Sequence, residues 1–214
     1  MTIERKVKEG GPFTWTQIQQ FVKSNQLESF ARSEEQFHNY QQFKTDLLAY
    51  GITLNDYVLN EELEWKQDDI RCQTSPATPS QEYSISQPQD LILYNDDDVK
   101  IIPNKFPYYF EDSVVHLCVW SKLTIPNDAD SPVGDISPLT RRIIERYLEK
   151  TFIEKGVSED NILWFKNWSS LQSVRSVSHI HVLLHDVDNG LIQKLLGTSG
   201  NTLTLEDYKE SLDE

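Results

Sequence analysis

The chain has 214 residues and a formal net charge of −14, with 38% hydrophobic and 11% aromatic residues. This is enough apolar material for a folded core in one domain, with or without an appendage. The acidic balance argues against nucleic acid or an anionic membrane as a partner, because either would favour a basic face. It leaves room for a local basic pocket inside an acidic shell.

The two cysteines do not predict a disulfide, because Cys72 lies in a polar stretch and Cys118 in an apolar run. Cys118 is therefore expected to be a small core residue. The first residues have no apolar signal core, and no run of about 18 apolar residues occurs. We therefore expect a soluble, cytoplasmic protein without a membrane partner.

Residues 1–65 predict a helical N-terminal region. Thr14 is placed to cap the first helix, and Gln17, three residues later, completes a capping box. Apolar spacings of three and four residues predict further helices. They are expected at 27–30, from Ser33 to Gly51, and at 54–63. By contrast, residues 66–89 are polar and rich in Ser, Thr and Pro, which predicts a flexible linker, or alternatively a phosphorylated regulatory segment.

Residues 90–190 predict an α+β core. Apolar runs indicate strands at 91–94, 99–104, 114–120, up to Asn167, and from about Val177 onward. Ser137 and Pro138 match an N-cap followed by proline at the first helical position. We expect a mainly antiparallel sheet with this crossing helix, preceded by a helical N-terminal cap. Residues 191–214 predict an acidic C-terminal tail with a loosely attached helix.

The stretch from Trp164 to Asp186 contains the strongest functional signal. Side chains alternate between the two faces of a strand, so His179 and His181 share one face. Two imidazoles at a strand end, after a loop rich in serine, can form a phosphate or metal site. The alternative is two histidines on a half-exposed face.

A metal site built on these histidines is a second interpretation. His179, His181 and His185 have the same strand parity, with His116 and Asp186 as further candidate ligands. A strand rises about 3.3 Å per residue, which separates the first and last of the three by roughly 13 Å. A single ion could therefore be bound by two of these histidines, with His116 as the further ligand. Our leading prediction names no metal and no cofactor.

Short motifs in a fixed order run through nearly the whole chain. They include Phe13-Thr14-Trp15, Tyr50-Gly51, Trp164-Phe165-Lys166-Asn167-Trp168 and His179-Ile180-His181-Val182. Together they resemble the fungal N-acetylglucosamine-induced protein family, which carries a domain of unknown function. The resemblance implies a soluble fungal protein linked by name to the amino-sugar response, and it implies no defined activity.

A second resemblance covers residues 91–186. His116 follows a proline-containing loop, a helix and a strand ending at Asn167 come next, and a loop of small residues leads into His179-Ile180-His181. This order resembles the histidine-triad and galactose-1-phosphate uridylyltransferase superfamily. The resemblance implies that His181 is a nucleophile that attacks phosphorus. It also implies that His179 supports the loop and that Ser176 binds phosphate oxygens.

The predicted ligand is a phosphorylated sugar, a nucleotide or a nucleotide sugar. The catalytic residues would be His181 and His179, and the predicted ligand-binding residues are His116, Asn167, Gln172, Ser176, Arg175 and Lys166. The sequence departs from the triad at Leu183, where a polar partner is expected. This departure favours the competing hypothesis of a non-catalytic binding or regulatory protein, whereas His181 favours phosphoryl or nucleotidyl transfer or hydrolysis.

Overall fold

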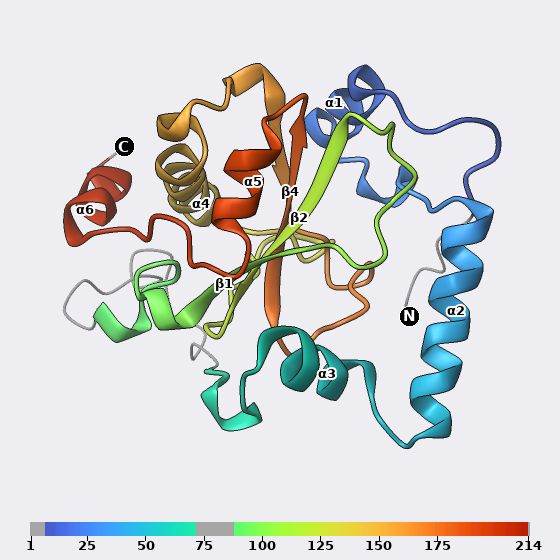
Figure 1. The fold of residues 1–214 in the computed structure, drawn as a ribbon. Helices are drawn as coiled ribbons and strands as arrows, with labels where there is room; N and C mark the ends of the chain where they lie inside the picture. The colour runs from blue at the N-terminus through green and yellow to red at the C-terminus, as the bar shows by residue number, and fades with distance from the viewer. Residues whose placement is uncertain (1–6, 72–87, 214) are drawn as a thin grey trace.

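Four antiparallel strands form the centre of the structure, a computed structural model that describes residues 7–71 and 88–213 (Figure 1). The sheet has the order β1-β2-β4-β3, and every neighbouring pair is antiparallel. The strands are β1 (Val99–Pro103), β2 (Val114–Ser121), β3 (Ile162–Phe165) and β4 (Ser178–His185). The predicted α+β class with a mainly antiparallel sheet is confirmed.

The alternation of side chains along β2 and β4 gives the sheet two different faces. In the register of these strands, Val119 lies opposite Ile180, and these aliphatic residues point to one face. Cys118 lies opposite His181, and the next pair on the same face is Trp120 opposite His179. One face is therefore aliphatic and the other carries the histidines.

Two helices cover the aliphatic face, α4 (Pro138–Thr151) and α5 (Asn189–Leu195), and α6 (Leu205–Asp213) packs against α4 on the side away from the sheet (Figure 1). The crossing helix α4 begins as predicted, because the Ser137 hydroxyl accepts the backbone N–H of Thr140. Its buried side, which includes Ile143, Ile144 and Tyr147, packs on the sheet. This packing forms the main core.

The C-terminal helix is not loosely attached, contrary to the prediction. Tyr208 is fully buried, and its hydroxyl donates a hydrogen bond to the Ile92 carbonyl. Asp207 is also buried and forms ion pairs with Arg146 and Lys150 of α4. The acidic composition suggested a solvated helix, but one carboxylate and one aromatic ring fix α6 to α4.

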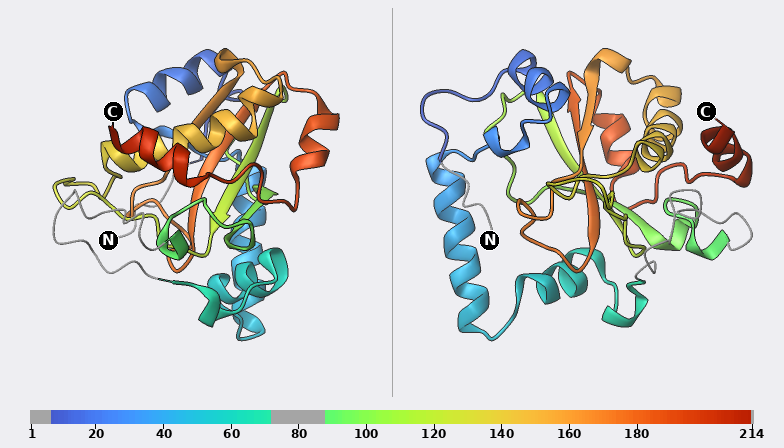
Figure 2. Two further views of the ribbon diagram at one scale, coloured as in Figure 1. Left: turned by 90° about the vertical axis from the view of Figure 1, so that its left-hand side faces the viewer. Right: turned by 180° about the vertical axis from the view of Figure 1, so that it is seen from behind.

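The N-terminal region covers the histidine face. It contains α1 (Trp15–Lys23), α2 (Glu34–Ala49), α3 (Leu54–Tyr57) and the π-helical turn η2 (Val58–Leu63) (Figure 2). Thr14 and Gln17 form the predicted capping box at α1. Gly51, which has a φ of +71°, follows α2 as expected for a residue that ends a helix.

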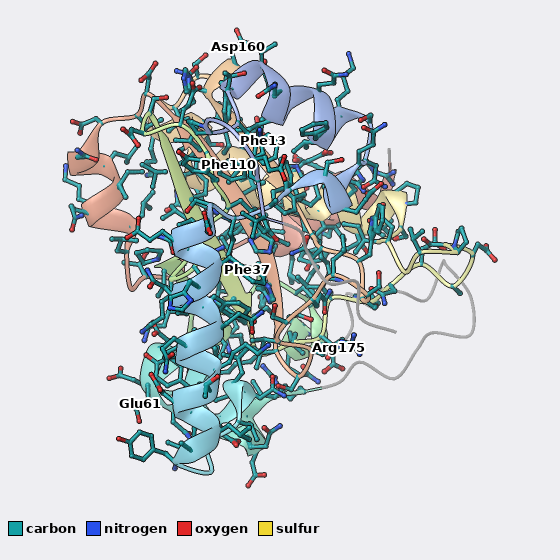
Figure 3. The ribbon with its side chains drawn as sticks, turned by 90° about the vertical axis from the view of Figure 1, so that its right-hand side faces the viewer. Phe13, Phe37, Glu61, Phe110, Asp160 and Arg175 are labelled. Carbon is teal, nitrogen blue, oxygen red and sulfur yellow. The ribbon has the colours of Figure 1, made fainter. Side chains whose placement is uncertain are left out.

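Two apolar clusters attach the N-terminal region to the sheet. An aromatic cluster joins Phe13, Phe30 and Phe110 to Phe165 and Leu183, with the rings of Phe30 and Phe110 5.3 Å apart. Figure 3 shows Phe13 and Phe110 close together. The second cluster lies near the other end of β4. Its members are Val58, Leu59, Leu63, Trp65, Cys118, Trp120, Val174 and Val177. The N-terminal region is therefore anchored at two separate places.

The predicted strand at 91–94 is wrong. Leu91, Ile92 and Leu93 are buried, but they form turns, and Leu93 has a positive φ of 57°. The backbone N–H of Leu203 bonds to the Leu93 carbonyl at 2.8 Å, so a C-terminal segment supplies the hydrogen bond. The apolar run indicated burial correctly, but a run of this length does not specify conformation.

Short 3-10 turns connect the larger elements. They are η1 (Leu27–Ser29), η3 (Gln67–Asp69), η5 (Pro88–Asp90), η6 (Asp96–Asp98), η7 (Ile153–Lys155) and η8 (Glu159–Asn161). Most of the expected linker, residues 72–87, lies outside the described residues. Just before it, Arg71 forms an ion pair with Asp98 and a β-bridge with Leu123. The division of the chain at residues 65, 89 and 190 stays a prediction.

No helix within residues 7–71 and 88–213 is long and apolar enough to cross a membrane.

Candidate functional site

The histidine face brings three potential ligand atoms close together. The Nε2 atom of His116 lies 3.0 Å from the Nδ1 atom of His181, and the sulfur of Cys118 lies 3.6 Å from the same Nδ1. All three side chains are buried. The register of β2 and β4 explains this arrangement, because Cys118 lies directly opposite His181 and His116 lies diagonally opposite His181.

Two asparagines determine which ring nitrogens of His116 and His181 carry protons. The Asn104 side-chain oxygen accepts the backbone N–H of Phe106 at 3.1 Å, so its amide nitrogen faces Nε2 of His116, also at 3.1 Å. Nε2 of His116 is therefore an acceptor. The amide nitrogen of Asn167 lies 3.0 Å from Nε2 of His181. His181 accordingly holds its proton on Nδ1, towards His116, and keeps a lone pair on Nε2.

A pocket of about 730 Å³ opens above this cluster, between the two apolar clusters that anchor the N-terminal region. Its floor contains Cys118, Trp120, His179 and His181. Side chains of α2, α3 and η2 form one wall, and the 167–175 loop forms another. Figure 3 shows Phe37 of α2 and Arg175 of this loop on the side of the molecule that α2 covers.

Aromatic and basic side chains dominate the pocket walls. The aromatic residues are Phe37, Tyr40, Phe43, Tyr57, Phe106 and Tyr108. Four cationic residues also line the pocket: Arg32, Lys44, Lys105 and Arg175. The guanidinium of Arg32 lies 4.4 Å from the centre of the Tyr40 ring. A protein of net charge −14 thus places four cations around this pocket.

Glu62 is the single carboxylate among the described residues that line the pocket. It forms an ion pair with Lys105 at 2.7 Å and accepts the Tyr57 hydroxyl at 2.9 Å. Burial acts to raise the pKa of Glu62, but the hydrogen bonds from Lys105 and Tyr57 hold it below its usual value. Glu62 is therefore ionised and offsets one cation, which leaves an excess of positive charge.

Five of the predicted site residues line the pocket: Asn167, Gln172, Arg175, His179 and His181. The amide of Gln172 donates to the Asn167 carbonyl at 2.7 Å and so supports the loop. His116 is buried beneath the floor and contacts His181. The structure thus brings six of the eight predicted residues together.

Lys166 and Ser176 are not among the pocket-lining residues. The Lys166 ammonium donates to the side-chain oxygen of Asn127 at 3.0 Å, away from its neighbour Asn167 on the chain. Burial lowers the pKa of Lys166 to about 8, although Asp135 acts in the opposite direction. The hydroxyl of Ser176 is buried and has no hydrogen-bond partner within the described part of the chain.

The other histidines of β4 differ in environment. The ring of His179 lies 4.2 Å from that of Trp120, and burial lowers the pKa of His179 to about 4, against the effect of its hydrogen bond to the Val177 carbonyl. His179 is therefore neutral near pH 7. His185 stacks on Trp15 at 4.9 Å and lies 3.7 Å from Glu111, so it does not belong to the histidine cluster.

Sequence reasoning missed the contribution of the N-terminal region, and of the segment after β1, to the pocket. Arg32, Lys44 and Lys105 come from segments that no local motif connects to β4. Cys118 was expected only as a core residue, although it lies two positions from His116 on a strand and therefore on the same face. That parity was the available signal.

Comparisons with known proteins identify the family. Residues 14–185 match the model of a family described as "Protein of unknown function (DUF3605)", and the chain belongs to this family. It is 55% identical over 205 residues to N-acetylglucosamine-induced protein 1 of Candida albicans, covering 95% of this chain and 81% of that protein.

Two further relatives extend the comparison. An uncharacterised protein of Saccharomyces cerevisiae, YPL067C, is 30% identical over 178 residues, covering 83% of this chain and 81% of its own length. A crystal structure of a protein named HTC1 is similar with a TM-score of 0.62 and 25% identity, and the match covers 94% of each chain. The family model and the Candida albicans relative confirm the first resemblance noted in the sequence.

Proposed function

We propose that the pocket binds a phosphorylated small molecule, namely a sugar phosphate, a nucleotide or a nucleotide sugar. The observation that carries this proposal is the charge of the pocket. Four cations and one ion-paired carboxylate line it, in a protein of net charge −14. Guanidinium and ammonium groups are the usual partners of phosphate oxygens.

The size and chemistry of the pocket agree with such a ligand. Its volume of about 730 Å³ lies within the range of roughly 300–1,000 Å³ that is typical of small-molecule sites. Tyr40, Tyr57 and Phe106 offer aromatic surfaces for a base or sugar ring. The name of the Candida albicans relative makes phosphorylated N-acetylglucosamine compounds the first ligands to test.

Calorimetric titration tests the proposal. The purified protein is titrated with N-acetylglucosamine phosphate, UDP-N-acetylglucosamine, AMP and unphosphorylated N-acetylglucosamine. We expect binding of at least one phosphorylated compound and none of the neutral sugar. Arg175→Gln should weaken this binding by roughly tenfold, the size of one charge-assisted contact.

Lys23→Gln is the matched control, because it removes one positive charge from the exposed end of α1, outside the pocket. It should leave the affinity unchanged. Equal binding of the neutral sugar, or equal effects of the two substitutions, would contradict the proposal.

A second candidate function is phosphoryl or nucleotidyl transfer or hydrolysis through His181. The supporting observation is that His181 lines the pocket with Nε2 unprotonated, as the acceptor of the Asn167 amide, which would have to turn away before Nε2 attacks phosphorus. The second resemblance noted in the sequence assigns the same role to this residue. Leu183 argues for binding without catalysis, since it is fully buried in the aromatic cluster and has no polar group to offer.

Covalent trapping separates catalysis from binding. The protein is incubated with nucleotides and nucleotide sugars that carry radioactive phosphate, and then denatured in alkali, which preserves phosphohistidine. Label or turnover that disappears in His181→Ala supports catalysis. Ligand binding without label or turnover supports the binding or regulatory protein.

A further inference from the structure

His116, Cys118 and His181 form a group of three potential metal ligands among the described residues. Their nitrogen and sulfur atoms all lie within 4.8 Å of one another, and all three residues are buried. The group differs from the metal site considered from the sequence, because a cysteine replaces His179 as the third ligand. His179 instead packs against Trp120 and directs its Nδ1 towards the Val177 carbonyl.

Two of the three separations match the ligand shell of one small ion. Zinc binds nitrogen at about 2.0–2.1 Å and sulfur at about 2.3 Å, so tetrahedral ligands place two nitrogens about 3.3 Å apart and nitrogen and sulfur about 3.6 Å apart. The nitrogens of His116 and His181 are 3.0 Å apart, and the sulfur of Cys118 is 3.6 Å from His181. The third pair, Nε2 of His116 and the sulfur of Cys118, lies within 4.8 Å, so side-chain movements of about 1 Å suffice to coordinate an ion.

We propose that His116 Nε2, Cys118 Sγ and His181 Nδ1 bind one zinc ion, with the fourth coordination position facing the pocket. Cys118 and His181 line the pocket, whereas His116 lies behind them, so the ion would enter from the pocket side. Three protein ligands with one open position are typical of zinc sites that bind an exogenous ligand. Imidazole with thiolate is a donor set that zinc accepts readily.

The protons of the cluster rearrange when the ion binds. Zinc displaces the thiol proton of Cys118 to solvent, and the Nδ1 proton of His181 moves to Nε2, so the bound site gains one net positive charge. Burial raises the pKa of the Cys118 thiol, so an anionic sulfur at this position requires an adjacent cation. The Asn167 amide must then turn its oxygen towards Nε2–H of His181.

This inference goes beyond the proposed function and does not depend on it. The cations of the pocket wall can bind phosphate without a metal ion. However, zinc on Nδ1 leaves a proton on Nε2, so the zinc-bound protein cannot use His181 as a nucleophile. The zinc-bound and nucleophilic forms of His181 therefore exclude each other.

Cobalt spectroscopy tests the site directly. The 214-residue chain with Cys72→Ser, which leaves Cys118 as its one cysteine, is reduced, treated with a chelator and titrated with Co²⁺. We expect one equivalent to bind, with the visible bands of tetrahedral cobalt and a sulfur-to-cobalt charge-transfer band. Zinc should displace the cobalt.

Two variants decide the assignment. Adding Cys118→Ser should abolish the charge-transfer band and weaken the affinity at least tenfold. His179→Gln changes a histidine of the same pocket that the proposed site does not use. It should leave the charge-transfer band and the affinity for cobalt unchanged. Loss of the band in His179→Gln, or binding that is unaffected by Cys118→Ser, would overturn the proposal.

A further measurement covers the case in which Cys118→Ser does not fold. Zinc-edge X-ray absorption of the Cys72→Ser protein should show one sulfur and two imidazole neighbours, and a zinc shell without sulfur would reject the site. Calorimetric titration with phosphorylated ligands in the presence of chelator is independent of the metal. Failure of the metal site therefore leaves the test of phosphate binding intact.

Discussion

Replacing Asp207 with asparagine tests how firmly the C-terminal helix is attached. The carboxylate of Asp207 is 5% exposed and contacts Arg146 at 2.8 Å and Lys150 at 2.5 Å. It also accepts the backbone N–H and the hydroxyl of Thr204 at 2.7 and 2.6 Å. Asparagine has one acceptor oxygen and turns an NH₂ group towards a donor, so at least one cation loses its partner.

The expected loss in the free energy of unfolding follows from this geometry. Removing one member of a buried ion pair costs about 3–5 kcal/mol. The side chains of Arg146 and Lys150 are 30% and 16% exposed, so water compensates part of the loss. We expect about 2–3 kcal/mol, or a fall in Tm of roughly 5–10 °C for a chain of this length.

The difference between the two proteins should depend on pH. Burial acts to raise the pKa of Asp207, but hydrogen bonds from Lys150, Thr204 and Arg146 hold it far below its usual value. A lowered pKa stabilises the folded state above the unfolded pKa of about 3.9, and the contribution declines as the pH falls from there towards the folded pKa. The advantage of the wild type should therefore be constant from about pH 7 to 5 and decrease below about pH 4.

Urea unfolding followed by circular dichroism at neutral and acidic pH measures this difference. Glu206→Gln is the control on the same helix, because its pair with Lys209 is largely exposed and should contribute less than about 0.5 kcal/mol. A loss below about 1 kcal/mol in Asp207→Asn at pH 7, or a loss that does not shrink in acid, would refute the reasoning.

Three further predictions concern single positions. Gly200→Ala should destabilise the protein by about 1–3 kcal/mol in urea unfolding, because φ is +69° and a Cβ would lie 2.6 Å from Thr151; an unchanged midpoint would contradict the close packing. Tyr208→Phe should cost about 1–2 kcal/mol in the same assay, since it leaves the buried Ile92 carbonyl without its hydroxyl donor, and a neutral effect would argue against that bond. The His179 imidazole has its pKa lowered to about 4, so its ¹⁵N resonances should stay those of a neutral ring between about pH 7 and 5, and a titration in that range would contradict its burial.

Local signals in the sequence predicted most helix boundaries. The capping box of Thr14 and Gln17 and the Ser137-Pro138 pair determine helix starts through contacts within one turn, so neighbouring residues suffice. The turn at 91–94 was beyond such reasoning, because the hydrogen bond to Leu93 comes from Leu203. Similarly, burial of Asp207 depends on α4, which is distant in the sequence.

The parts of the site that depend on one strand could be predicted from the sequence, and the parts that depend on contacts between distant segments could not. His179 and His181 share a face because of strand parity, which the sequence contains. The proximity of His116 to His181 depends on the register of β2 and β4, and the role of Cys118 follows from the same register. The cations Arg32 and Lys44 were missed because their place in the pocket requires the N-terminal region to fold back over the sheet, which no pattern within either segment specifies.

The two faces of β2 and β4 separate the demands of stability from those of function. Residues of one parity, such as Val119 and Ile180, hold α4 in the main core. Residues of the other parity, such as Cys118 and His181, lie in the site. Substitutions at alternate positions of the same two strands can therefore change the chemistry of the pocket while the packing against α4 stays intact, so related proteins with this sheet can diverge in ligand without losing the fold.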